Sequence, residues 1–163
     1  MNHELKLARA YEHPELVKEL FTEYMNMLIE GDSTFITYMA QQNYDDEIAH
    51  LDVKYKEPEN RLYLLYVDGQ VAGSIGMLKF DDRSCELKRL YLKQEFRGKG
   101  LGDFLVEKIL GDAREAGYEY MLLDTMPFLP KAYQLYKKHG FYDIEKYRES
   151  PIDVAHYMRL DLK

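Results

Sequence analysis

Apolar positions near the start of the chain recur every three or four residues, which is the spacing of one face of an α-helix. They are Leu16, Leu20, Phe21, Tyr24 and Leu28. Pro14 and Glu15 stand just before them, and a proline followed by an acid is typical of the first turn of a helix. The pattern predicts this helix and a short strand before it, over residues 5–10. Ser33 or Thr34 is positioned to cap a second helix that runs towards position 51.

In the middle of the chain the apolar positions form short runs typical of β-strands. Residues 62–67 and 70–78 are two such runs, and Asp68-Gly69 between them is a strong signal for a hairpin. A third run covers residues 85–92. The pattern therefore predicts an antiparallel meander of three strands.

After the meander, helical and strand patterns alternate. One helix face is outlined by Leu101, Phe104, Leu105, Ile109, Ala113 and Ala116. Gly117 then provides a C-terminal stop, and residues 120–124 form a buried type of strand. This order predicts a mixed α/β sheet with helices on its faces.

The C-terminal part predicts one more helix and two strands. Pro130 leads into the helix, and Gly140 is expected to end it in the left-handed conformation. Phe141 is then expected to pack back near Tyr136, because a hydrophobic contact accompanies this kind of helix ending. The final strands are expected over residues 141–147 and 155–162.

The composition suits one soluble, globular domain. The chain has 163 residues, of which 46% are hydrophobic, and this is enough to bury a sizeable core. Its apolar runs fall short of the roughly 20 residues that a membrane-spanning helix needs, and residues 1–4 do not resemble a signal peptide. Cys85 is the only cysteine, which excludes an internal disulfide and a zinc site built from cysteines. We therefore expect a single cytoplasmic domain over residues 1–163, with no metal and no membrane partner.

The charge balance argues against nucleic acid as a partner. Lys and Arg number 22 against 29 Asp and Glu, a net charge of −7, whereas phosphate contacts need clustered cations. One stretch differs, because five cations accompany a single acid, Glu95, between positions 88 and 99. The cations are Lys88, Arg89, Lys93, Arg97 and Lys99. This stretch is either a solvated basic strand edge or part of a site for an anion.

Three glycines follow where the strand over residues 85–92 gives way to the next helix. The sequence there is Arg97-Gly98-Lys99-Gly100-Leu101-Gly102. The start of a helix presents free N–H groups and the positive end of its dipole, and glycines let a ligand approach the backbone. Together with the cations, the turn predicts a site for a phosphate or pyrophosphate group. A tight connection without a ligand is the alternative.

Two nucleotide-binding motifs compete for this turn. The phosphate-loop motif requires Ser or Thr after its lysine, and Lys99 is followed by Gly100. The dinucleotide motif G-x-G-x-x-G begins at Gly98 but has Asp103 in place of its third glycine. Asp124 does stand where a ribose-binding acid is expected. The antiparallel meander before the turn disfavours a dinucleotide fold, which is kept as a minor alternative.

The pattern that fits the turn is Arg-x-x-Gly-x-Gly, met by Arg97, Gly100 and Gly102. On this pattern the sequence resembles the GNAT superfamily of acyl-CoA-dependent N-acyltransferases. Further matching segments are CELKRLYL (85–92), LLDT (122–125), AYQLYKKHGF (132–141) and YMRLDL (157–162). The C-terminal half matches the family order piece by piece, whereas the first part matches only in its strand-helix-helix layout.

The resemblance implies a mostly antiparallel central sheet with helices on both faces and a V-shaped splay between the fourth and fifth strands. Acetyl-CoA would bind in that splay as co-substrate. Its pantetheine arm would lie along Leu90, Tyr91 and Leu92 like an added strand. The residues implied at its pyrophosphate are Arg97, Gly98, Lys99, Gly100, Leu101, Gly102 and Asp103.

The resemblance also implies two catalytic candidates for transfer of an acetyl group to an amine. Glu86 matches a glutamate that can serve as general base, and a structural ion pair is its alternative. Tyr136 matches the tyrosine of A-x-x-L-Y-x-x-x-G-F, which points at the CoA sulfur and protonates it as it leaves. A core role is its alternative, because the chain has 15 tyrosines. The N–H of Leu90 is a candidate to polarise the acetyl carbonyl.

Other reactive side chains are expected to be structural. Cys85 adjoins Glu86, and a neighbouring acid disfavours a thiolate. His156 alternates with Met158 and Leu160 along a strand, which predicts a histidine of the core. The acidic run over residues 45–47 predicts a solvated helix face, with attraction of a cationic amine as its alternative.

The resemblance leaves the acceptor open, as a small-molecule or peptide amine. In the family it is selected by the first two helices and by the loop that here covers residues 147–154. Leu129 stands where many members have Asn, so one contact to CoA is missing or made otherwise. A homodimer is compatible with the family. Two other hypotheses stay open, a non-catalytic CoA-binding sensor or interaction module and a dinucleotide-binding protein.

Overall fold

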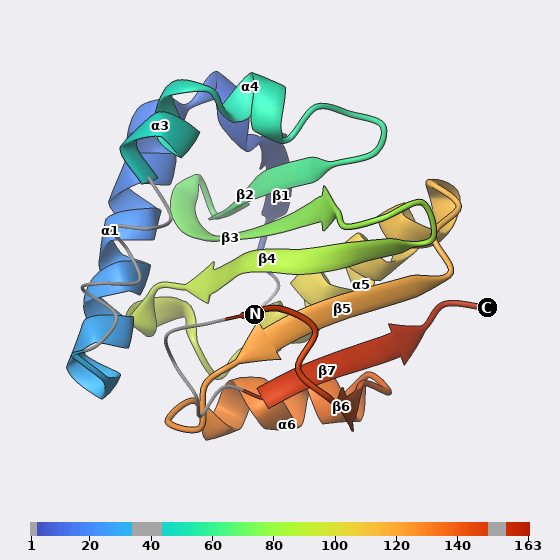
Figure 1. The fold of residues 1–163 in the computed structure, drawn as a ribbon. Helices are drawn as coiled ribbons and strands as arrows, with labels where there is room; N and C mark the ends of the chain where they lie inside the picture. The colour runs from blue at the N-terminus through green and yellow to red at the C-terminus, as the bar shows by residue number, and fades with distance from the viewer. Residues whose placement is uncertain (1–2, 34–43, 150–155) are drawn as a thin grey trace.

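A seven-stranded, mostly antiparallel sheet organises the computed structural model, which describes residues 3–33, 44–149 and 156–163 (Figure 1). The strand order is β1-β2-β3-β4-β5-β7-β6, and among these strands only β4 and β5 pair in parallel. The strands are β1 (Leu5–Arg9), β2 (Arg61–Val67), β3 (Gln70–Lys79), β4 (Ser84–Leu92), β5 (Tyr120–Thr125), β6 (Tyr142–Ile144) and β7 (His156–Asp161). The mixed α/β class is confirmed. The single parallel pair does not support the dinucleotide alternative, because that fold needs a mostly parallel sheet.

Helices cover both faces of the sheet. They are α1 (Pro14–Gly31), α3 (Tyr44–Ala49), α4 (Leu51–Lys54), α5 (Leu101–Glu115) and α6 (Pro130–Lys138), with 3-10 turns η1 (Ala10–Glu12) and η2 (Gln94–Phe96). On one face, Leu20 of α1 and Leu51 of α4 pack against Leu64 of β2. On the other face, α5 and α6 pack against the middle of the sheet. No helix within the described ranges is long and apolar enough to cross a membrane.

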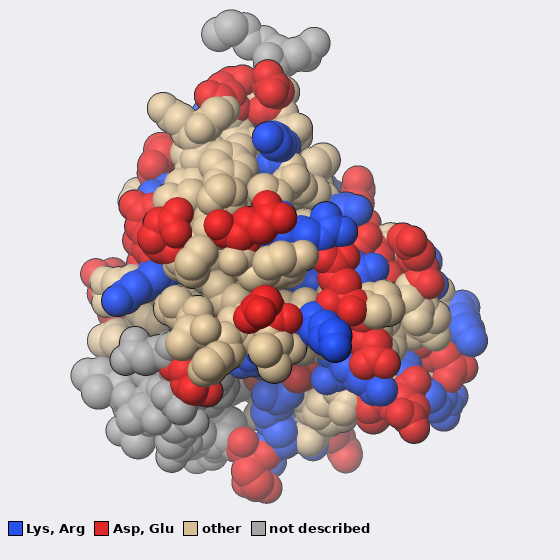
Figure 2. Space-filling view, turned by 90° about the horizontal axis from the view of Figure 1, so that it is seen from above, with Lys and Arg blue, Asp and Glu red and all other residues tan. Residues whose placement is uncertain are grey.

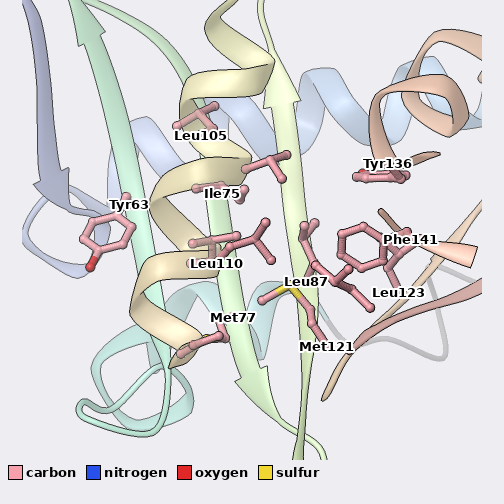
Figure 3. Close-up of a cluster of buried hydrophobic side chains, with 14 of the residues drawn as sticks. Tyr63, Ile75, Met77, Leu87, Leu105, Leu110, Met121, Leu123, Tyr136 and Phe141 are labelled. Atoms are coloured by element: carbon pink, nitrogen blue, oxygen red, sulfur yellow. The ribbon is translucent and has the colours of Figure 1, made fainter. Parts of the chain in front are cut away.

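The larger core lies between the sheet and α5 (Figure 3). Leu105 of α5 packs in one cluster with Ile75 and Met77 of β3, and all three side chains are fully buried. Tyr136 and Phe141 extend the same cluster towards α6. Burial of apolar area is the main favourable term in folding, so this layer holds α5 and α6 against β2, β3, β4, β5 and β7.

Two turns match the sequence pattern closely. Asp68 and Gly69 have φ values of 50° and 83°, as a two-residue hairpin turn between β2 and β3 requires. Gly140 follows α6 with a φ of 100°, and the N–H of Phe141 donates to the Tyr136 carbonyl at 3.0 Å. The rings of Tyr136 and Phe141 meet edge to face, with centroids 5.8 Å apart. The predicted helix ending and its aromatic contact are confirmed.

Two predicted elements differ from the structure. The strand expected over residues 141–147 is shorter, because β6 covers Tyr142–Ile144 only. The chain then leaves the sheet, and Tyr147 and Arg148 turn instead towards Glu86 of β4. The first part of the helix expected from residue 33 or 34 towards position 51 lies on positions 34–43, outside the described residues, and the rest of that range contains α3 and the start of α4.

Candidate active site

β4 and β5 pair at one end and separate at the other. The register pairs between them are Ser84 with Tyr120, Cys85 with Met121 and Glu86 with Leu122. β4 continues to Leu92 paired with β3 alone. The backbone groups of its second half therefore have no strand partner on the β5 side among the described residues, and such groups favour a hydrogen-bonding ligand. This arrangement is the expected splay.

A β-bulge interrupts β4 inside the splay. Arg89 has a φ of 58°, and the register with β3 shifts so that Gly76 pairs with Lys88 but Ser74 pairs with Tyr91. The Ser74 hydroxyl donates a 2.7 Å hydrogen bond to the Arg89 carbonyl. The bulge changes the direction of the strand just before Leu90. No sequence signal pointed to it, because a positive φ is uncommon outside glycine.

A buried ion pair fixes the side chain of the bulged residue. Arg89 donates to the carboxylate oxygens of Glu47 in α3 at 2.9 and 3.1 Å, and its guanidinium lies over the Phe21 ring. Lys54 contacts the same carboxylate. Burial raises the pKa of Glu47, but the attraction of Arg89 and Lys54 outweighs it and the net pKa is lowered. The prediction of a solvated acidic face is therefore wrong for Glu47.

The basic stretch is largely neutralised, so it is not the solvated strand edge of the sequence interpretation. β4 lies inside the sheet, and the side chains of Lys88, Arg89 and Lys93 are only 17%, 8% and 15% exposed. Lys93 pairs with two glutamates of α1 at 3.1 and 3.4 Å. Figure 2 shows the same mixing on one face of the molecule, where acidic and basic side chains lie next to one another. Arg97 and Lys99 stay exposed beside the glycine turn.

The three glycines of the turn have two different roles. Gly98 and Gly100 have φ values of 77° and 78°, and Gly100 is the N-cap of α5. Only glycine adopts such values without strain. At Gly102 a Cβ would lie 3.1 Å from the Leu135 side chain, so this glycine allows α5 and α6 to approach. The turn thus presents the free N–H groups of residues 101–103 at its surface.

One acid stands among these N–H groups and is neutralised by α6. The carboxylate of Asp103 lies 3.0 Å from Lys138 Nζ and 2.8 Å from His139 Nε2. Hydrogen bonds from these two side chains lower the pKa of Asp103. Arg97 donates to the Leu92 carbonyl at 2.9 Å and covers the Tyr91 ring. The negative charge of Asp103 is therefore balanced, and the turn keeps the free N–H groups that favour an anion at a helix start.

Glu86 lies at the point where β4 and β5 separate, and it is 6% exposed. Its Oε2 accepts a 2.8 Å hydrogen bond from the Tyr147 hydroxyl and another from Arg148 Nη2. Lys88 Nζ lies 3.9 Å from the same oxygen. Within the described residues the other oxygen, Oε1, has no hydrogen-bond donor. Glu86 thus has the ion pair of its structural alternative, and it also keeps one oxygen available.

Tyr147 and Arg148 come from the segment after β6, and aromatic rings hold them. The Tyr147 ring lies between Phe80 and Tyr157, with centroid distances of 5.3 and 5.1 Å. Burial, together with the charges of Glu86 and Asp124, raises the pKa of Tyr147, so its hydroxyl keeps its proton. Sequence reasoning named the loop that begins at residue 147 as a selector of the acceptor. It did not foresee a contact with Glu86.

Tyr136 is a core residue that has Tyr24 of α1 and Asp124 of β5 as electrostatic neighbours. Its side chain is 6% exposed and belongs to the α5 core, as its structural alternative predicted. Burial raises its pKa, and the neighbouring Tyr24 and Asp124 raise it further. Asp124 also acts on Lys88 and Tyr147. Asp124 of β5 is therefore an electrostatic neighbour both of the Tyr136 phenol and of Lys88 and Tyr147, which contact Glu86.

The other reactive side chains are structural, with one correction. His156 is not a core histidine, because its side chain is 43% exposed at the start of β7, where it stacks on Tyr133. Burial raises the pKa of the Cys85 thiol to about 12, as an inert cysteine requires. Leu129 provides no side-chain cap at the start of α6. No group of three or more metal-binding side chains occurs within the ranges that the structure describes.

Several proteins of known class are similar to this chain in sequence. The Acetyltransferase (GNAT) family profile matches residues 16–141. An N-acetyltransferase of Dictyostelium discoideum is 30% identical across 98% of this chain and 99% of its own length. One of Schizosaccharomyces pombe is 38% identical across 74% of this chain and 76% of its own.

Solved structures agree on the fold. An acetyltransferase from Streptococcus agalactiae superposes with a TM-score of 0.77 at 23% identity, over 98% of both chains. The PaiA N-acetyltransferase of Thermoplasma acidophilum, solved in complex with coenzyme A, gives 0.76 at 19% identity over 99% of both. A profile match over most of the sequence, supported by a relative that aligns almost from end to end, shows that this chain belongs to the GNAT family of acetyltransferases.

Proposed function

We propose that this protein is an N-acetyltransferase that moves the acetyl group of acetyl-CoA to a primary amine by direct attack. One observation carries the proposal. The unpaired edge of β4 is followed, after the short turn η2, by the left-handed turn at Gly98 and Gly100, so that an edge for an extended arm and a site for an anion come one after the other along the chain. Pantetheine and pyrophosphate occur in that order in CoA.

Each part of the co-substrate has a matching surface. The pantetheine amides would pair with the backbone of residues 90–92, as an added strand does. The pyrophosphate would accept hydrogen bonds from the N–H groups of residues 98–103, helped by the α5 dipole and by Arg97 and Lys99. These two cations are exposed, so solvent screens their contribution.

The chemistry needs a neutral amine, a polarised carbonyl and a proton for the leaving group. The amine nitrogen attacks the acetyl carbon, and the C–N bond forms as the C–S bond breaks. Glu86 takes the proton that the amine loses, directly or through water. Tyr136 gives its proton to the CoA thiolate, and the Leu90 N–H hydrogen-bonds the acetyl oxygen during the attack.

The test is release of the CoA thiol from acetyl-CoA across a panel of amines, with a reaction lacking acceptor as control. We expect release that depends on the acceptor, with an N-acetylated product identified by mass spectrometry. Calorimetry measures acetyl-CoA binding in parallel.

Saturable acetyl-CoA binding without transfer to any amine would instead support a CoA-binding sensor. Stabilisation by NAD but not by acetyl-CoA would support a dinucleotide-binding protein. Either result would contradict the proposed activity.

A further inference from the structure

Arg148 lies beside Glu86 with most of its hydrogen-bonding capacity unused. Its Nη2 donates to Glu86, and this is the one side-chain hydrogen bond that it makes among the described residues. Its Nε–H is buried without an acceptor. Buried donors are nearly always satisfied in folded proteins, because leaving one unpaired is costly. An ion pair with Glu86 alone therefore does not account for this arginine.

The position of Arg148 is fixed by its surroundings. Its guanidinium lies over the rings of Tyr147 and Phe80, 5.2 and 6.0 Å from their centroids. The Tyr157 hydroxyl donates to its backbone carbonyl at 3.4 Å. The side chain is still 26% exposed. A guanidinium that is held in place before a ligand arrives loses little entropy when it binds a carboxylate in its planar fork.

Charges of both signs surround this point. Lys88 contributes a second cation, whose side chain is 17% exposed and whose Nζ lies 3.9 Å from Glu86 Oε2. Burial lowers the pKa of Lys88, and the negative charges of Glu86 and Asp124 oppose that effect. Two cations and two acids therefore share one site. Such a site complements a ligand that has both an amino group and an acidic group.

We propose that the acceptor is a small amine with a carboxylate close to its amino group, such as an α-amino acid, and that Arg148 and Lys88 bind that carboxylate. Arg148 is in direct contact with Glu86, the group that receives the amine's proton under the proposed function on which this inference rests. The amino group and the carboxylate of the acceptor must therefore be a short distance apart.

The same cations disfavour other amines. A polyamine would bring a second ammonium close to Arg148 and Lys88, and like charges without a partner are a strong source of discrimination. A plain alkyl amine would avoid that repulsion but would leave the Arg148 donors unpaired. The site therefore predicts a ranking in which the amino acid is best and the diamine is worst.

The experiment compares amino acids with the amines that lack their α-carboxylate. The pairs are leucine with 3-methylbutylamine, phenylalanine with 2-phenylethylamine, histidine with histamine, and lysine with cadaverine. The readout is the ratio of kcat/KM within each pair, measured by CoA thiol release. We expect at least one amino acid to be preferred by about 10-fold to 100-fold, as charge-assisted hydrogen bonds imply.

Arg148→Gln should lower that ratio at least severalfold, with Lys88 as the remaining cation, whatever it does to absolute turnover. Arg148→Lys keeps the charge but loses the planar fork, so its ratio should be intermediate. Arg159→Gln is the matched control, because Arg159 is an arginine of β7 that contacts Tyr142 and Asp161 and not Glu86. Its ratio should equal that of the unchanged protein. Thermal melts establish that each variant is folded.

The outcomes separate the two proposals. Acetylation of the amines with no preference for their amino acids, or a preference that is undiminished in Arg148→Gln, would overturn this inference and leave the acetyltransferase activity standing. If acetyl-CoA binds but no amine of these pairs or of the wider panel is acetylated, the proposed function is overturned, and this inference with it.

Discussion

The hydroxyl of Ser74 on β3 donates a 2.7 Å hydrogen bond to the carbonyl of Arg89 on β4, where β4 bulges. A bulge leaves one residue out of the strand pairing, so its carbonyl needs another donor. Ser74 supplies that donor from a side chain that is 1% exposed. A side chain on one strand thus takes the place of a backbone hydrogen bond on the next.

Ser74→Ala should therefore cost both stability and turnover. Loss of this buried hydrogen bond predicts about 1–2 kcal/mol lower free energy of unfolding. If the bulge aims the Leu90 N–H at the acetyl oxygen, kcat should fall about tenfold or more, while the Kd for CoA changes less than about threefold. Urea unfolding, calorimetry and steady-state kinetics measure these quantities.

Ser84→Ala is the control for that variant, because Ser84 is also buried on β4 but lies before the bulge. It should reduce stability without changing kcat beyond about twofold. Equal kcat values in the two variants would show that the bulge does not position a catalytic group.

Tyr136→Phe should lower turnover more than it weakens CoA binding. Burial raises the pKa of Tyr136, and Tyr24 and Asp124 raise it further, so the phenol is protonated throughout the neutral range. Loss of a general acid is expected to reduce kcat about 100-fold or more. Pre-steady-state thiol release and CoA calorimetry separate the two effects.

Tyr118→Phe is the matched control for that tyrosine, since its buried hydroxyl donates to the Glu59 carbonyl at 2.8 Å. It should lose about 1 kcal/mol of stability and keep its kcat. Unchanged turnover in Tyr136→Phe would leave Tyr136 as a core residue only.

Glu47→Gln should destabilise the protein in a pH-dependent way. The variant removes the negative charge that faces the buried Arg89 guanidinium, which predicts a loss of about 3 kcal/mol at pH 7. Because the pKa of Glu47 is lowered in the folded state, its contribution is complete above its unfolded value of about 4.3 and fades as the pH falls further. The difference from the unchanged protein should therefore shrink between about pH 4.5 and pH 3.

Urea unfolding at several pH values measures this difference. Glu107→Gln is the control, as Glu107 is an exposed residue of α5, and it should stay within about 0.5 kcal/mol at every pH. If the loss for Glu47→Gln stays constant down to pH 3, Glu47 stabilises the fold through its packing and hydrogen bonds and not through its charge.

Local features of this fold could be predicted from the sequence. The hairpin at Asp68-Gly69, the helix ending at Gly140 and the glycine turn before α5 each depend on a few adjacent residues, whose chemistry restricts the backbone directly. The family match then required only that these pieces occur in order. Whether a segment is a helix or a strand could be predicted for the same reason, because the spacing of its apolar residues is a local property.

The contacts that complete the candidate site could not be predicted in this way. Arg89 reaches Glu47 across 42 residues and Arg148 reaches Glu86 across 62. Each pair is set by how separate elements pack, and an acid or an arginine alone looks like an ordinary surface residue. The prediction for His156 was wrong in the opposite sense, because this residue was expected in the core and is exposed. The alternation along β7 indicates which face it lies on but not that it stands at the exposed end of the strand.

Gly100 offers the sharpest test of where CoA binds. Its φ of 78° is a left-handed value, and nothing lies within 4 Å of a Cβ added there, so bulk alone is tolerated. Gly100→Ala should cost about 1–2 kcal/mol of stability from backbone strain and weaken CoA binding, because the turn would shift. Gly100→Glu adds a negative charge facing the phosphates and should abolish measurable binding.

Gly111→Ala provides the control within the same helix. Gly111 also has open space around its Cβ position, but it lies inside α5 with no left-handed φ. Alanine there should stabilise the protein by about 0.5–1 kcal/mol and leave the Kd for CoA unchanged. Calorimetry with CoA and urea unfolding of the three variants complete the comparison. Micromolar affinity in Gly100→Glu would mean that the pyrophosphate lies elsewhere, since an added carboxylate, unlike the paired Asp103, would repel a diphosphate bound at that turn.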